Sequence, residues 1–93
     1  MKISITPRAS EHLTATYEYL HGISPRLAAS QMRRIFDGID QLKQFPESGH
    51  PGRVESTREL PIPRTPFLVV YSIAAQTIYI IAVLHGKQRW PQR

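Results

Sequence analysis

The residues with the clearest chemical capacity lie in a short basic and aromatic stretch near the end of the sequence. His85 follows a run of eight uncharged residues, and Lys87, Arg89 and Trp90 come soon after it. An imidazole can give or take a proton near neutral pH, and the two cations can hold phosphate or carboxylate groups. A site that cleaves RNA through its 2′-hydroxyl group needs such an acid or base, together with cations at the phosphate. The stretch therefore suits either phosphate chemistry or the binding of an anionic partner without chemistry.

The same residues also have structural interpretations. A histidine–glycine pair at a strand end is often a turn whose imidazole bonds a backbone carbonyl group, and we favour this role for His85. Trp90 either contacts a partner or folds back over the open face of the sheet, and we favour the second. Arg58 either faces the basic stretch or pairs with Glu55 or Glu59.

Charge is unevenly distributed along the chain of 93 residues, which carries 12 lysines and arginines against 7 acidic residues. Residues 1–45 hold six basic and four acidic side chains, whereas residues 60–93 contain no carboxylate side chain. An acid-free last third favours an anionic partner, either nucleic acid or an acidic protein segment. Cysteine is absent and the four histidines lack the spacing of metal ligands, so we expect no metal site and no cofactor.

The length indicates a single small domain that covers residues 1–93. The first residues lack the long apolar core of a signal peptide, and no stretch reaches the roughly 20 apolar residues of a membrane-spanning helix. We therefore expect a soluble, cytoplasmic protein that does not contact a membrane.

The elements that must position the basic stretch are predicted from turn signals and apolar periodicity. Proline after threonine or serine starts each of two helices, and we expect Gly22 to end the first. The last strand is uncharged and largely β-branched, which is typical of a central strand buried on both faces. The expected elements are a strand at 2–6, helices at 7–20 and 25–44, and strands at 57–62, 67–74 and 77–84.

These elements predict an α+β fold of order β-α-α-β-β-β. The connection between the helices, residues 21–23, is short enough that the helices must form an antiparallel hairpin. We expect this hairpin to pack on one face of a small, largely antiparallel sheet. Residues 46–53 form a loop rich in glycine and proline, and Gly86 lets the chain turn out of the central strand.

Four segments of the sequence carry a family resemblance. They are Phe45-Pro46 with Gly49 and Gly52, Arg58-Glu59-Leu60, Phe67-Leu68-Val69-Val70-Tyr71, and Val83-Leu84-His85-Gly86 through Arg89-Trp90-Pro91. In this order and at this chain length they resemble the RelE/ParE superfamily of toxins from bacterial type II toxin–antitoxin systems. The resemblance extends over essentially the whole chain, and the ending His-Gly-x-x-x-Trp-Pro is more similar to the ParE side.

The resemblance implies a growth-inhibiting toxin that is neutralised by a cognate antitoxin encoded beside it. ParE-like members inhibit DNA gyrase. This implies that Arg58, Lys87, Arg89 and Trp90 contact gyrase or a related topoisomerase without catalysis. RelE-like members cut mRNA on the ribosome, which would make Arg58, His85, Lys87 and Arg89 the catalytic candidates.

Two departures from the nuclease pattern bear on this choice. In the nuclease branch the strand that here contains Tyr71 usually carries an arginine two residues after the turn, and that arginine contacts the scissile phosphate; Leu68 stands at its place. The terminal tyrosine or histidine–tyrosine pair of several nucleases is also absent. We therefore rank the topoisomerase-binding toxin first and the mRNA endonuclease second. Leu68 also leaves open a third function, an inactive toxin fold that only binds its antitoxin.

Overall fold

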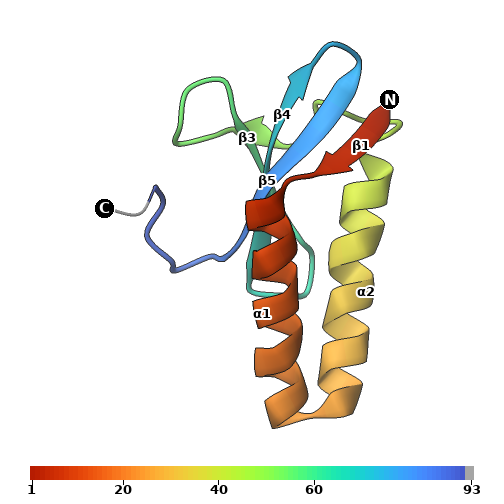
Figure 1. Cartoon of the computed structure of the whole chain (residues 1–93), viewed down its shortest axis with the longest axis vertical. Coiled ribbons are helices and arrows are strands. Elements are labelled where there is room, and N and C mark those ends of the chain that lie inside the picture. The colour runs from red at the N-terminus through yellow and green to blue at the C-terminus, as the bar shows by residue number, and fades with distance from the viewer. Residues whose placement is uncertain (92–93) are drawn as a thin grey trace.

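A computed structural model describes residues 1–91, in which two helices pack against a five-stranded sheet (Figure 1). The elements are β1 Lys2–Ile5, α1 Pro7–Ile23, α2 Pro25–Gln41, β2 His50–Pro51, β3 Arg58–Pro61, β4 Phe67–Ala74 and β5 Thr77–His85. The predicted α+β fold is confirmed, with one strand more than expected. The additional strand, β2, lies in the segment that we predicted to be a loop, and it pairs with β3.

The strands lie in the order β1-β5-β4-β3-β2, so β5 occupies the interior of the sheet between β1 and β4. β1 runs parallel to β5 and the other neighbours are antiparallel, so the prediction of a largely antiparallel sheet is confirmed. The expectation that β5 is buried on both faces is correct only for its second half, Ala82–Leu84. Tyr79 in the first half is 37% exposed. The helices cover one face of the sheet, whereas the other face carries only a smaller apolar cluster near the end of β5 and the loop residue Arg53 over Glu59.

The two helices begin as the sequence predicted, at a hydroxyl cap followed by proline. The Thr6 hydroxyl accepts a hydrogen bond from the Ala9 N–H at 3.2 Å, and the Ser24 hydroxyl accepts one from the Leu27 N–H at 3.2 Å. Such caps satisfy N–H groups that have no partner within the helix.

The predicted end of α1 was wrong, because the helix continues through Gly22 to Ile23. Ser24 is extended, as expected before Pro25, and its N–H donates to the Leu20 carbonyl at 2.9 Å. One residue therefore ends α1 and caps α2, where we had expected a three-residue loop. α2 in turn ends at Gln41 instead of Gln44, and turns follow it.

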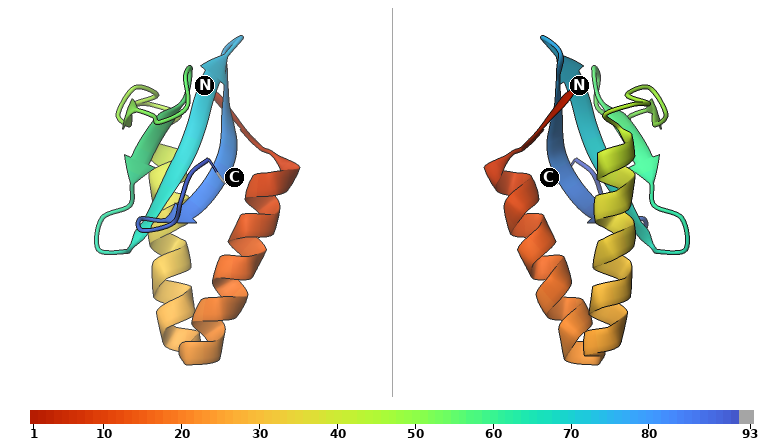
Figure 2. Two further views of the ribbon diagram at one scale, coloured as in Figure 1. Left: turned by 90° about the vertical axis from the view of Figure 1, so that its left-hand side faces the viewer. Right: turned by 90° about the vertical axis from the view of Figure 1, so that its right-hand side faces the viewer.

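Both helices lie on the same side of the sheet (Figure 2). The main core lies between them and the sheet, and it includes Leu13 and Leu20 of α1, Ile35 and Ile39 of α2, and Val69, Tyr71, Ile78 and Ile80 of the strands. A smaller cluster on the opposite face joins Val70, Ala82 and Leu84 with the partly buried Leu68, Ile81 and Trp90. We call this the outer cluster, and it is the surface that the chain reaches after β5.

Tyr71 connects the sheet to the loop that follows α2. Its hydroxyl donates to the Pro46 carbonyl at 2.7 Å and accepts from the Gly49 N–H at 2.9 Å. A β-carbon at Gly49 would lie 2.8 Å from the Tyr71 hydroxyl, so only glycine fits at this contact. The loop is therefore held in a fixed position against β3 and β4. None of the helices in residues 1–91 is long and apolar enough to cross a membrane.

Candidate functional site

The chain leaves β5 through a tight turn at His85. The His85 Nδ1 accepts from the Lys87 N–H at 3.1 Å, and the His85 carbonyl accepts from the Gln88 N–H at 2.8 Å. The prediction that His85 forms a turn is confirmed. The predicted bond to a backbone carbonyl group was wrong, because the imidazole accepts a hydrogen bond from an amide N–H. The Gly86 N–H donates to the Pro66 carbonyl at 2.6 Å, and a β-carbon at Gly86 would lie 3.3 Å from that oxygen. Close approach, and not a positive φ, therefore favours glycine here.

The segment after this turn, residues 86–91, is called the tail below; it is the blue trace in Figure 1. Lys87 and Arg89 are exposed, whereas Trp90 is half-buried against the outer cluster. The preference for a Trp90 that folds back over the sheet is thus confirmed. The guanidinium carbon of Arg8 lies 6.0 Å from the centre of the Trp90 ring, within the range of a cation–π interaction. Arg8, which the sequence did not single out, therefore lies beside one of the predicted site residues, Trp90.

Arg58 lies apart from the tail. Its Nε donates to the Gly49 carbonyl at 2.9 Å and its Nη2 to the Glu47 carbonyl at 3.0 Å. In the sheet Arg58 is paired with Tyr71, which belongs to the helix-side core, so its side chain projects from that face. The structure therefore brings Lys87, Arg89 and Trp90 together but leaves Arg58 on the other face of the sheet. The ion pair of Arg58 with Glu55 or Glu59 that we considered is not formed.

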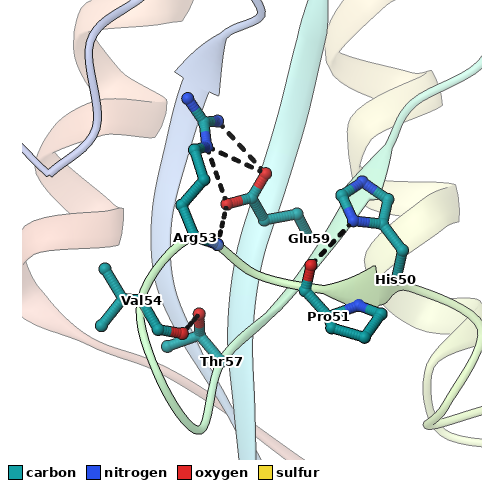
Figure 3. A network of polar contacts seen from close by, with 6 residues as sticks. All are labelled: His50, Pro51, Arg53, Val54, Thr57 and Glu59. Carbon is teal, nitrogen blue, oxygen red and sulfur yellow. Dashed lines mark hydrogen bonds and ion pairs between the residues drawn. The ribbon is translucent and has the colours of Figure 1, made fainter.

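Glu59 instead forms an ion pair with Arg53 (Figure 3). This pair was not predicted from the sequence. The side chain of Glu59 is 4% exposed, and its Oε2 accepts from both the backbone N–H and the Nε of Arg53 at 3.0 Å. Burial alone would raise the pKa of Glu59, but the hydrogen bonds and charge of Arg53, with a smaller contribution from His50, lower it. The pair fixes the segment between β2 and β3 over the sheet.

Leu68 lies in β4 and packs, partly buried, against the outer cluster. The nuclease pattern has an arginine at this position, whereas Leu68 packs against apolar side chains of the same sheet. Within residues 1–91, no group of three or more histidine, cysteine or acidic side chains is placed to hold a metal ion.

The apolar periodicity of the first helix predicts that His12 faces water, but in the structure His12 reaches the edge of β5. Its Nδ1 accepts from the Val83 N–H at 3.2 Å. This N–H belongs to the part of β5 that extends beyond its pairing with β1. Burial and, to a smaller extent, the charge of Arg8 lower the pKa of His12, while Glu11 acts in the opposite direction. The neutral imidazole therefore caps the exposed strand edge.

We predict that His12→Asn makes the stability less dependent on pH. Because the folded pKa of His12 is below its ordinary value of about 6.5, its stabilising contribution is present above that pH and is lost as the pH falls. Asparagine retains an acceptor for the Val83 N–H but does not titrate. Urea unfolding between about pH 7.5 and pH 5.5 is expected to show a steeper loss for the wild type than for His12→Asn. Parallel curves would contradict the prediction.

The helical hairpin on one face of a mixed sheet, together with a basic tail, defines a fold of the RelE/ParE type. Comparisons with known proteins agree with this class. Residues 3–90 match the family model described as ParE toxin of type II toxin–antitoxin system, parDE. The chain therefore belongs to the ParE family of toxins from type II toxin–antitoxin systems.

Two individual proteins support this assignment. The candidate toxin Y4kP of Sinorhizobium fredii is 37% identical over 91 residues, which cover 98% of this chain and 94% of that protein. A chain of the chromosomal ParDE system from P. aeruginosa has a similar structure, with a TM-score of 0.83 and 26% identity. The match covers 91% of this chain and 95% of that one. Both matches therefore extend over almost the whole length of the chain.

Proposed function

We propose that this protein inhibits growth by binding DNA gyrase or a related topoisomerase, and that a cognate antitoxin neutralises it. The contact surface in this proposal is the tail, with Lys87 and Arg89 as exposed cations and Trp90 as the aromatic residue beside them. One observation carries it: Trp90 packs on the outer cluster, so the two cations project from a segment that is already held on the sheet. Membership of the ParE family, whose model is named for a toxin–antitoxin system, supports the same function.

The geometry suits binding better than catalysis. A tail that is held before it meets its target loses less conformational entropy on binding than a free segment would. Exposed cations in a region without carboxylates also accelerate encounter with an anionic surface. In this proposal Arg58 acts indirectly, since its guanidinium group holds the loop after α2 through the carbonyls of Glu47 and Gly49.

A ribosome-dependent endonuclease is the alternative that the experiment must separate. Its candidates would be His85, Lys87 and Arg89 with Arg58, yet Arg58 projects from the opposite face to the outer cluster. Leu68 occupies the place of the phosphate-binding arginine with an apolar contact. Both observations favour the binding function over RNA cleavage.

The test is induction of this chain without an antitoxin, followed by two measurements on the same cells. Covalent gyrase–DNA complexes are quantified, and the 5′ ends of ribosome-bound RNA are sequenced. Growth arrest with accumulated DNA complexes and intact transcripts is the expected result. Codon-phased cuts would instead make the protein a nuclease, and unimpaired growth would make it an inactive toxin fold. Coexpression of the protein encoded beside it is expected to restore growth if that protein is the antitoxin.

A further inference from the structure

A small pocket lies between the beginning of α1, the end of β5 and the tail. It has a volume of about 330 Å³ and is lined by Arg8, His12, Leu84, Gln88, Trp90 and Pro91. Thr6 fixes α1 beside β5, because its N–H and its hydroxyl both donate to the Ile80 carbonyl, at 3.1 and 2.8 Å. Residues four apart on a helix share a face, so Arg8 and His12 both reach the strand end.

Two polar side chains of the pocket have already used their acceptor atoms. The His12 Nδ1 accepts from the Val83 N–H, so the proton of the neutral ring must be on Nε2. The Gln88 Oε1 accepts from the His85 N–H at 3.2 Å, which leaves the two amide N–H groups of Gln88 as donors. Toward a ligand, His12 and Gln88 therefore act as hydrogen-bond donors.

The other two polar side chains are donors by nature. Trp90 Nε1 is buried and has no hydrogen-bond partner among residues 1–91. A buried donor without a partner is rare in folded proteins, and an acceptor from a ligand would satisfy it. Arg8 adds a full positive charge next to the Trp90 ring. Glu11, the acidic residue that acts on the pKa of His12, is exposed and does not line the pocket.

We propose that this pocket binds the carboxylate of an acidic side chain from a partner peptide. Four donor side chains, one of them charged, match the acceptor-only oxygens of a carboxylate. Leu84, Pro91 and the Trp90 ring supply apolar walls for the methylene groups of that side chain. Because a phosphate group has no methylene groups to pack on these walls, an acidic peptide side chain suits the pocket better than a DNA phosphate.

This inference extends the proposal that an antitoxin binds the protein. It rests on that proposal because a partner protein must supply the carboxylate. Occupation of the pocket would connect Gln88 and Trp90 of the tail with Arg8 of α1. Since Lys87 and Arg89 flank Gln88 in the chain, the same event would restrict the proposed target-binding surface. An acidic partner residue at this point would thus act on the tail directly.

The test uses the single tryptophan of the chain, whose indole N–H gives one signal in a ¹H–¹⁵N NMR spectrum. The full chain is titrated with N-acetyl-glutamate amide, with the neutral N-acetyl-glutamine amide, and with inorganic phosphate. A saturable shift of the Trp90 indole signal is expected with the glutamate compound alone. Arg8→Gln is expected to weaken this binding about tenfold, because a charged hydrogen bond is lost.

Arg26→Gln is the matched control for Arg8→Gln. Arg26 is exposed and follows Pro25 at the start of α2, as Arg8 follows Pro7 at the start of α1, but it does not line the pocket. The affinity of the Arg26→Gln variant for the glutamate compound is expected to equal that of the wild type. The remaining signals of each spectrum report whether the variant is folded.

Three results would overturn the inference: no saturable shift of the indole signal, an equal shift with the glutamine compound, or a shift with phosphate alone. An equal loss of affinity in Arg8→Gln and Arg26→Gln would do the same, since it would indicate a general charge effect. The titration needs neither growth arrest nor a topoisomerase. A chain that binds the glutamate compound but does not inhibit growth would therefore contradict only the proposed function.

Discussion

Replacing Lys87 and Arg89 together with glutamine is expected to abolish growth inhibition without disturbing the fold. Both residues are exposed, and within residues 1–91 neither side chain makes a hydrogen bond or an ion pair. Trp90 remains in place on the outer cluster, so the tail should keep its position. Loss of two charged contacts at an interface is expected to reduce the affinity for the target by about a hundredfold.

The measurement is inhibition of DNA supercoiling by purified gyrase, together with colony counts after induction. Arg26→Gln with Arg33→Gln is the matched control, because these two residues are exposed on α2 and the net charge changes equally. The control variant is expected to remain toxic. If both double variants lose activity to the same degree, total charge and not the tail determines the inhibition. If the Lys87 and Arg89 variant remains fully toxic, the tail is not the contact surface.

Local signals were sufficient to predict where the helices begin. Thr6-Pro7 and Ser24-Pro25 each combine a side-chain cap with a proline that has no N–H to satisfy, and these effects act within a few residues. Gly22 was misjudged for a related reason. Glycine only lowers helix propensity, whereas the Ser24-Pro25 pair ends the helix two residues later by steric exclusion.

The contacts that define the site depend on strand register, which the sequence does not specify in detail. Glu59 faces Arg53 because β3 pairs with β4 so that Glu59 lies opposite Val70, on the face of the outer cluster. His12 caps β5 because β1 ends before the second half of that strand. The apolar periodicity of α1 placed His12 toward solvent, so it gave no signal of this contact. No local pattern indicates which arginine pairs with Glu59.

The outer face of the sheet thus combines two structures with different chemistry. Near the end of β5 it carries the apolar cluster on which Trp90 packs, and beside β3 it carries the buried Glu59 with Arg53. The Arg53–Glu59 pair holds the segment between β2 and β3 on this face. Its stability can be tested without reference to the target.

Arg53→Met is expected to lower the free energy of unfolding at neutral pH by about 2 kcal/mol, because it leaves the carboxylate of Glu59 buried without its cation. Removal of one partner from a fully buried pair costs more, but the side chain of Arg53 is 42% exposed, so solvent screens part of the interaction. Lys43→Met is the matched control. It breaks the Lys43–Asp40 pair, whose side chains are 52% and 71% exposed, and is expected to change stability by no more than about 0.5 kcal/mol.

The effect of Arg53→Met should also depend on pH in a defined direction. In the wild type the lowered pKa of Glu59 stabilises the fold above the unfolded pKa of about 4.3, and this contribution is lost as the pH falls. In Arg53→Met, burial without the cation raises the pKa of Glu59, so stability falls as the pH rises through the unfolded value. The difference between the two proteins in urea unfolding is therefore expected to grow from about pH 3 to pH 7. A constant difference over this range would show that Arg53 stabilises the loop by packing and not by its charge.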